Sequence, residues 1–297
     1  KISDYLIKPV NPHQVLLSIK KNLEFSQLIN QKTNSVYQRE FASISSMINS
    51  VETPQDWIDV YKKIIYWELE LESLDENQML DVLLMQKKDA NNNFFKHVKK
   101  NYQKWIEQDD IIMSHNVFEK IVFPTISSDT PTFFLLIDNL RYDQWKIIQP
   151  LLDPYFTINE KSSFSILPTA TQYCRNAIFS GMMPEKIKQK FPTLWLDDIE
   201  EGGKNMHEKE FVISLLDHLS FKSDISFNKV FNHEHGTKVL DRLNEFLNKS
   251  LNIIIYNFVD ILSHAKTDVK MIKELANNDK AYRDLTLTWF KNSPLFD

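Results

Sequence analysis

Hydrophobic and polar positions along the chain follow two different periods. Between residues 25 and 123 apolar residues recur at helical spacing, without glycine and with Pro54 as the one proline. Polar clusters interrupt this pattern at residues 30–34, 50–54, 73–77 and 89–93. Thr53 followed by Pro54 is typical of a helix start. The region therefore predicts several antiparallel helices, a bundle that spaces other domains.

The pattern changes after a polar turn at Ser127–Pro131. Phe133–Ile137 is an uninterrupted apolar run, and Ile253–Val259 is a second run of the same kind. Such runs are typical of strands that are buried on both faces. Helical patterns lie between and after them, at Val239–Leu247 and Val269–Leu275. Buried strands that alternate with helices predict an α/β domain with a largely parallel sheet.

The first 25 residues form a third segment. Ser3–Ile7 alternates as a strand does, Lys8 and Pro9 follow, and apolar residues between Val15 and Leu23 then share one helical face. This order predicts a strand, a turn and an amphipathic helix. Because the first residue is not Met and the chain opens inside a pattern, we expect further sequence upstream.

Composition narrows the function classes. With 42% hydrophobic and 25% charged residues, the 297-residue chain resembles a soluble globular protein of about two domains. Its net charge of -5 argues against long duplex DNA as a partner. The single cysteine, Cys174, excludes an internal disulfide and fits the cytoplasm. No apolar run predicts membrane insertion, and four glycines leave no glycine-rich phosphate loop.

Each of the two apolar runs is followed by an aspartate, Asp138 after the first and Asp260 after the second. In open α/β sheets ligands bind beyond the carboxyl ends of the strands, so both carboxylates are predicted to face the functional crevice. The alternative is that each aspartate only caps the helix that follows it. His264 lies four residues after Asp260, one helical turn, and the pair suits zinc or manganese.

A third motif follows a proline turn at Pro168. Thr171 is expected at a helix N-terminus, where the helix dipole and backbone N–H groups favour an anion, and is a candidate nucleophile. Arg175, one turn later, is a candidate ligand of phosphate oxygens, and Gly181 is expected to end the helix. The alternative is a structural threonine cap beside a solvated arginine.

In this order, the motifs resemble the alkaline phosphatase superfamily. Its members have an Asp at a strand end, a Thr or Ser nucleophile, a helix that ends at Gly, and then Asp-x-x-x-His. The spacing of Thr171, Gly181 and Pro184 matches that pattern and favours Thr171 over Thr169. Within the superfamily, LLIDNLRYDQW and TATQYCRNAIFSG are similar to the PglZ branch. The resemblance covers about Thr132–Asp297.

The opening DYLIKP and the helix after it are similar to the end of a response-regulator receiver domain, in which the lysine before proline contacts the phosphorylated aspartate. Lys8 would take that role in the phosphorylation switch. The whole order resembles PorX-like response regulators, truncated at both ends. The expected domains are a receiver end at 1–25, a helical bundle linker at 26–126, and the N-terminal part of an alkaline-phosphatase-like PglZ domain at 127–297.

The resemblance implies a cytoplasmic two-component response regulator whose PglZ effector is a zinc-dependent phosphodiesterase acting on small cyclic or linear oligonucleotides. It would regulate type IX secretion. Its expected partners are a sensor histidine kinase and components of type IX secretion or sigma-factor signalling, together with a second copy in a homodimer. The alternative is a non-catalytic output module with the PglZ fold that mediates protein–protein signalling.

The resemblance also implies two Zn²⁺ ions in the complete site. Asp138 and Thr171 would bind one ion, and Asp260 and His264 the other. In the superfamily the remaining ligands, an Asp-His pair and a further His, come after this segment. Because residues 265–297 contain no histidine, this piece is expected to lack the rear half of the metal site and to be incomplete as a catalyst.

The implied mechanism begins with attack by the Thr171 hydroxyl on phosphorus, assisted by the metals. A covalent phospho-threonine would follow. Arg175 and Asn176 would neutralise the non-bridging oxygens in the transition state.

Overall fold

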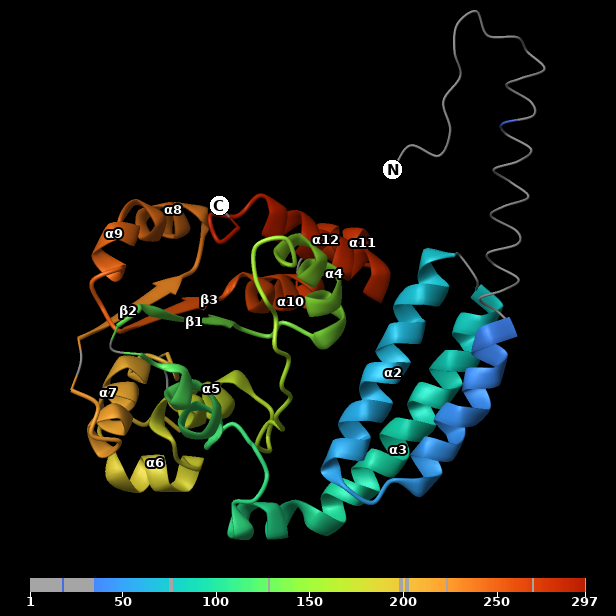
Figure 1. Cartoon of the computed structure of the whole chain (residues 1–297), viewed down its shortest axis with the longest axis horizontal. Helices are drawn as coiled ribbons and strands as arrows, with labels where there is room; N and C mark the ends of the chain where they lie inside the picture. The colour runs from blue at the N-terminus through green and yellow to red at the C-terminus, as the bar shows by residue number, and fades with distance from the viewer. Residues whose placement is uncertain are drawn as a thin grey trace, which may run out of the picture. The chain divides into compact units, whose positions relative to one another are not determined.

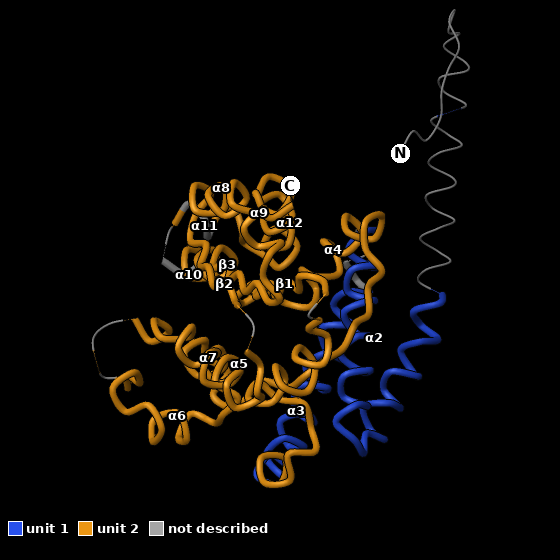
Figure 2. Tube along the Cα trace, turned by 60° about the vertical axis from the view of Figure 1, so that its left-hand side comes forward, with its two compact units in different colours: residues 1–103 blue, residues 104–297 orange. Residues whose placement is uncertain are grey.

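The computed structural model describes residue 18 and residues 35–296, except 75–76, 128, 198–199, 201–202, 223 and 269. The chain divides into two compact units, one up to Gln103 and one from Lys104 (Figure 2). Lys8, the predicted switch residue, lies outside the described residues, as does the strand predicted at Ser3–Ile7.

The first unit is helical throughout the part that the structure describes (Figure 1). Residues 35–50 form one helix, and α2 (Pro54–Ser73) and α3 (Asn77–Gln108) follow. Thr53 caps α2 through its Oγ1, which accepts from the Asp56 N–H at 3.2 Å, while the Asp56 carboxylate accepts from the Thr53 N–H at 2.8 Å. This reciprocal cap satisfies backbone donors that the first helical turn leaves without partners. The helix start predicted at Thr53 is confirmed.

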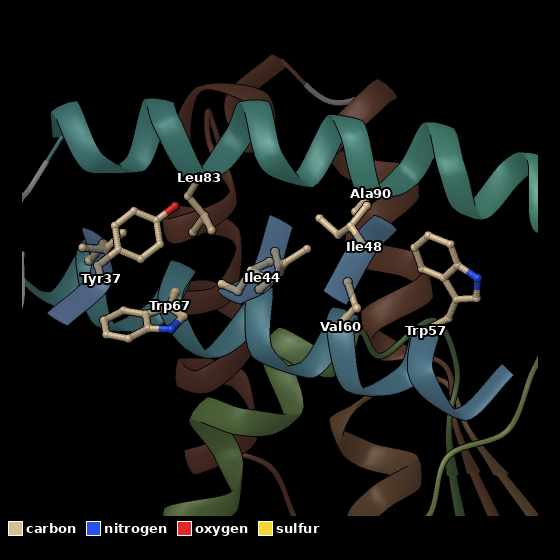
Figure 3. Packing of buried hydrophobic residues seen from close by; sticks show 10 residues of the cluster. Tyr37, Ile44, Ile48, Trp57, Val60, Trp67, Leu83 and Ala90 are labelled. Carbon is tan, nitrogen blue, oxygen red and sulfur yellow. The ribbon is translucent and has the colours of Figure 1, made fainter. Parts of the chain in front are cut away.

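Large apolar side chains hold the helices of the first unit together. Figure 3 shows Trp57 and Trp67 of α2 among side chains of the helix at 35–50 and of α3. Tyr37 and Trp67 stack at a tilt with ring centroids 5.3 Å apart, and Ile44 and Leu83 are fully buried. Burial of such side chains stabilises a bundle far more than helix propensity does. The helical periodicity of the sequence is therefore explained by one shared core.

The described part of the second unit contains three parallel strands in the order β1-β3-β2. They are β1 (Thr132–Ile137), β2 (Ile225–Val230) and β3 (Leu251–Tyr256). Ile137 and Val230 both pair with Tyr256, so all three strands end at the same level. The predicted α/β fold with a parallel sheet is confirmed, while β2 was not foreseen in the sequence.

The two apolar runs differ in burial. All six residues of β3 are buried, as predicted. In β1, Phe133 and Leu135 are 36% and 46% exposed, whereas Phe134 and Leu136 pack into the core. The prediction that this strand is buried on both faces is wrong, because β1 lies at an edge of the described sheet and one of its faces is left partly uncovered.

Helices cover both faces of the sheet. Those of the second unit are α4 (Tyr142–Leu152), α5 (Thr171–Ser180), α6 (Pro184–Lys190), α7 (Glu208–His218), α8 (His233–Asp241), α9 (Leu243–Phe246), α10 (Phe258–Asp268), α11 (Lys270–Leu275) and α12 (Asp279–Lys291). The π-turn η1 (Phe118–Val122) and the 3-10 turn η2 (Phe123–Thr125) precede β1. Helices α5 and α7 lie on one side of the sheet, and α8 and α12 lie on the other (Figure 1). Their apolar side chains pack against the strands.

The helix α5 ends at Gly181, as predicted from the sequence. Gly181 has a φ of 67°, in the left-handed region that L side chains rarely adopt. A Cβ at this position would stand 2.7 Å from Cδ1 of Leu215 on α7. Gly181 thus allows the turn after α5 and lets the end of α5 approach α7 closely.

Gly181→Ala should lower the free energy of unfolding by about 1–2 kcal/mol or more, because the left-handed backbone alone costs that much. Urea titration followed by circular dichroism measures the loss. Gly236→Ala is the comparison, since Gly236 lies in the helical backbone of α8 and a Cβ there would stand 3.1 Å from Cγ of Pro294, which tests close packing without a left-handed backbone. An equal or larger loss for Gly236→Ala would contradict the role of backbone strain at Gly181.

Candidate functional site

Polar side chains gather where the three strands end. Asp138 directly follows β1, Asn257 directly follows β3, and Lys229 is the last residue but one of β2. The Asp138 N–H donates to the Tyr256 carbonyl at 2.9 Å and so extends the β1–β3 ladder by one residue. Asn139 then turns the chain with a φ of 61°. The register of the sheet therefore brings residues distant in sequence to one edge.

Asp138 is held in a single orientation at this edge. Its side chain is 7% exposed, and its Oδ2 accepts from Nη1 of Arg175 at 2.7 Å. Among the described residues, no hydrogen bond is made to its Oδ1. The carboxylate is thus fixed through one oxygen and has acceptor capacity left on the other.

Asp260 lies in the first turn of α10 rather than at the end of a strand. Because β3 ends at Tyr256, the second apolar run crosses from the strand into the helix, and the prediction that the strand reaches Asp260 is wrong. His264 lies one turn later, with its Nε2 3.7 Å from Oδ1 of Asp260. Burial and the charge of Asp138 raise the pKa of Asp260, while His264 and Arg175 offset part of that rise. The negative charge of Asp138 therefore acts on the carboxyl group of Asp260.

Thr171 is the first residue of α5, and Ala170 occupies the N-cap position before it. Ala170 has an extended backbone with φ -71° and ψ 142°, and no side chain accepts a hydrogen bond at this helix start. The structural alternative of a threonine cap at residue 171 is wrong for that reason. Arg175 follows Thr171 by one turn on the same helical face, and its side chain reaches Asp138 at the sheet edge.

The guanidinium of Arg175 is the centre of a buried ion network. Its Nε and Nη2 donate to Oε1 and Oε2 of Glu208, both at 2.7 Å, and its Nη1 donates to Asp138 and, at 3.2 Å, to Oδ1 of Asn257. Lys229 Nζ lies 2.8 Å from Oε2 of Glu208. Burial alone would lower the pKa of Arg175, and the two carboxylates raise it above its usual value. The network therefore joins two cations, Arg175 and Lys229, to two anions, Asp138 and Glu208.

These contacts bear on the expected roles of Arg175 and Asn176. Arg175 is 5% exposed, so the alternative of a solvated arginine is wrong. Asn176 is 3% exposed, donates to the Lys204 carbonyl at 3.0 Å and accepts from Nδ2 of Asn205 at 3.0 Å. Contacts of Arg175 and Asn176 with phosphate stay predictions, which the observed hydrogen bonds do not favour.

Sequence reasoning missed three members of the network, Glu208, Lys229 and Asn257. Glu208 resembles any acidic residue in the first turn of a helix. Lys229 carries a weak signal, because it shares the alternate positions of the strand with Ile225 and Phe227, where a partly buried lysine needs a partner. Asn257 interrupts the second apolar run and marks the end of β3.

The donor atoms at this edge fit a divalent cation in their chemistry. Asp138 has an oxygen available, Asp260 is a second carboxylate close enough to be perturbed by it, and His264 adds an imidazole. Over the residues that the structure describes, no three His, Cys, Asp or Glu side chains stand close enough together to hold a metal ion. A complete metal site therefore requires further ligands or a rearrangement of these residues.

Two family models match the chain. Residues 27–106 match the PorX response regulator linker domain, and residues 117–291 match the BREX system PglZ alkaline phosphatase-like domain, which is more than half of the chain. No curated protein matches it. In the described parts of the chain, every helix is too short or too polar to cross a membrane.

Proposed function

Because the chain belongs to the PglZ alkaline phosphatase-like family and carries the linker of PorX response regulators, we propose that its PglZ domain is a metal-dependent phosphodiesterase effector. A response regulator of this kind works with a sensor kinase. The observation that supports the activity most directly is that Asp138, held by Arg175 of α5, follows β1 at the end of the parallel sheet, where its charge acts on Asp260. Ligands of open α/β sheets bind at such an edge.

In this proposal Thr171 is the nucleophile. Its hydroxyl gives up a proton to solvent, and Oγ1 forms a bond to phosphorus as one ester oxygen leaves and takes up a proton. Water then cleaves the bond between Oγ1 and phosphorus, which frees the threonine and releases a phosphomonoester. The N-terminus of α5, where Thr171 lies, favours the negative charge of the phosphodiester. A bound divalent metal would lower the pKa of the attacking hydroxyl and stabilise charge on the phosphoryl oxygens.

The metal ligands within this chain would form two groups. Asp138 and Thr171 would hold one Zn²⁺, and Asp260 and His264 the other. The i, i+4 spacing of Asp260 and His264 on α10 suits binding of one ion by both.

The resemblance to PorX-like regulators extends the proposal beyond the chemistry. We propose small cyclic or linear oligonucleotides as substrates, a cytoplasmic location, a sensor histidine kinase as partner and control of type IX secretion. Phosphorylation of the receiver would control dimerisation.

The second candidate function is a non-catalytic output module with the PglZ fold. The ion pair between Arg175 and Asp138 favours it, because the first metal-facing carboxylate is already neutralised by a buried cation. In that case the same surface would serve protein–protein signalling, and a metal would be structural.

The full-length protein should hydrolyse bis(p-nitrophenyl) phosphate with Zn²⁺ present, lose that activity on chelation, and regain it when Zn²⁺ is returned. Asp260→Asn should reduce turnover at least about 100-fold, since even outer-shell changes at metal sites cost 10–100-fold. Asp241→Asn, at an exposed position on α8, is the control and should have wild-type turnover. Turnover that survives chelation would contradict metal dependence, and zinc binding without hydrolysis would favour the output module.

A further inference from the structure

We propose that Glu208 and Arg175 act as a positioning pair for Asp138. Glu208 fixes the guanidinium of Arg175, and Arg175 holds one oxygen of Asp138 so that the other faces a divalent cation. Arg175 then makes no direct contact with the phosphate. This inference rests on the proposed function for the identity of the cation site.

The hydrogen bonds of Arg175 already use one edge of the guanidinium and both contacts of Nη1, so two parallel N–H groups are not available to a phosphate. The Nε–Nη2 edge forms a fork with both oxygens of Glu208, at 2.7 Å each. On the other side, Nη1 donates to Asp138 at 2.7 Å and to Asn257 at 3.2 Å. Bidentate recognition of phosphate needs two parallel N–H groups along one edge. Arg175 would have to give up Asp138, Asn257 or Glu208 to supply them.

Glu208 contributes charge as well as geometry. It is fully buried and contacts both Arg175 and Lys229. Without its negative charge, the cation on Arg175 would directly oppose a metal ion at Asp138. With it, the network of two cations and two anions is neutral before a metal binds. A buried charge that loses its counter-ion is costly, so the four groups depend on one another.

Asp138 is held by a second residue through one of its two oxygens. Its Oδ2 accepts from Arg175, while no described residue donates to its Oδ1. Metal-binding carboxylates are commonly held by such outer contacts, which fix their orientation and tune their affinity. The contact of Arg175 with Asn257 ties the pair to the end of β3, the strand that leads into the helix of Asp260. The pair therefore connects the supports of both candidate metal carboxylates.

The test measures metal and phosphate binding separately in the full-length protein. The Kd for Zn²⁺ is obtained by competition with a chromogenic chelator, and the Kd for inorganic phosphate by calorimetry at saturating Zn²⁺. Glu208→Gln should weaken Zn²⁺ binding roughly 10–100-fold and leave phosphate binding within about twofold. Glu210→Gln, on the same helix with a side chain 52% exposed, is the matched control and should change neither constant.

Arg175→Lys serves as a second variant if Glu208→Gln does not fold, which circular dichroism would show. It keeps the positive charge but loses the paired hydrogen bonds to Glu208, so we expect the same weakening of Zn²⁺ binding. Unchanged Zn²⁺ affinity with phosphate binding weakened tenfold or more would make Arg175 a phosphate ligand and overturn the proposal. Tighter Zn²⁺ binding would also overturn it, because Arg175 would then be a competitor of the metal.

These outcomes are distinct from failure of the proposed function. A wild-type protein that binds Zn²⁺ without hydrolysing phosphodiesters would contradict the proposed activity alone. The affinity measurements need no turnover, so the positioning pair would still be tested. Wild-type protein that binds no Zn²⁺ would overturn both.

Discussion

Thr171→Ala should lower kcat for phosphodiester hydrolysis by the full-length protein at least about 10³-fold at saturating Zn²⁺, as expected when a nucleophile is removed. The fold should be unaffected, because Ala170 occupies the N-cap position of α5 and the Thr171 side chain does not cap the helix. Alanine is also a better helix former than threonine. A steady-state assay of each variant, together with a urea titration, separates loss of chemistry from loss of structure.

Two further variants make this result specific. Thr169→Ala removes a hydroxyl two residues earlier in the same turn and should keep at least half of the activity. Thr171→Ser keeps a hydroxyl and should retain measurable turnover. Wild-type turnover in Thr171→Ala would exclude this residue as the nucleophile, and an equal loss in Thr169→Ala would leave the assignment without support.

Phe179→Ala should lower the free energy of unfolding by about 3–5 kcal/mol, the usual range for a phenylalanine removed from a core. Phe179 is fully buried, and its ring lies 6.1 Å from that of Phe134 on β1 and 5.6 Å from that of Phe227 on β2. It therefore anchors α5 to two strands of the sheet. We expect weaker zinc binding in the same variant, because α5 also carries Thr171 and Arg175.

Phe156→Ala is the control for this measurement, since Phe156 is 64% exposed in the same unit. Its free energy of unfolding should stay within about 0.5 kcal/mol of the wild-type value. Urea denaturation monitored by circular dichroism gives both values. Similar losses in the two variants would mean that Phe179 does not anchor α5 through its packing.

The fold was predictable where local pattern decides it. Neighbouring residues alone determine three features: the helices before residue 123, the strand β3 and the end of α5 at a glycine. The strand β2 was not predictable in this way, because Ser226, Asn228 and Lys229 make it resemble a loop. Its polar residues are satisfied by distant partners: Ser226 donates to Asn252 at 2.6 Å, and Lys229 pairs with Glu208.

The sequence pointed to only part of the ion network, because it gave neither the contacts of Arg175 nor its partners Glu208 and Asn257. The turn of helix that joins Asp260 to His264 follows from their spacing. The end of β3 was misplaced because Phe258 and Val259 continue the apolar run into α10. The partners of Arg175 lie 33, 37 and 82 residues away in sequence, and only the assembled sheet and helices bring them together. Periodicity carries no information about such distant pairs.

The exposed face of β1 has a consequence for handling the chain. Among the described strands, β1 has a neighbour on one side, and Phe133 and Leu135 alternate along its partly uncovered face. An apolar strand at the margin of a sheet is a template for pairing with another molecule, and this hazard grows when much of the protein is unfolded. Refolding at low protein concentration would therefore favour the native fold over aggregates formed through this strand.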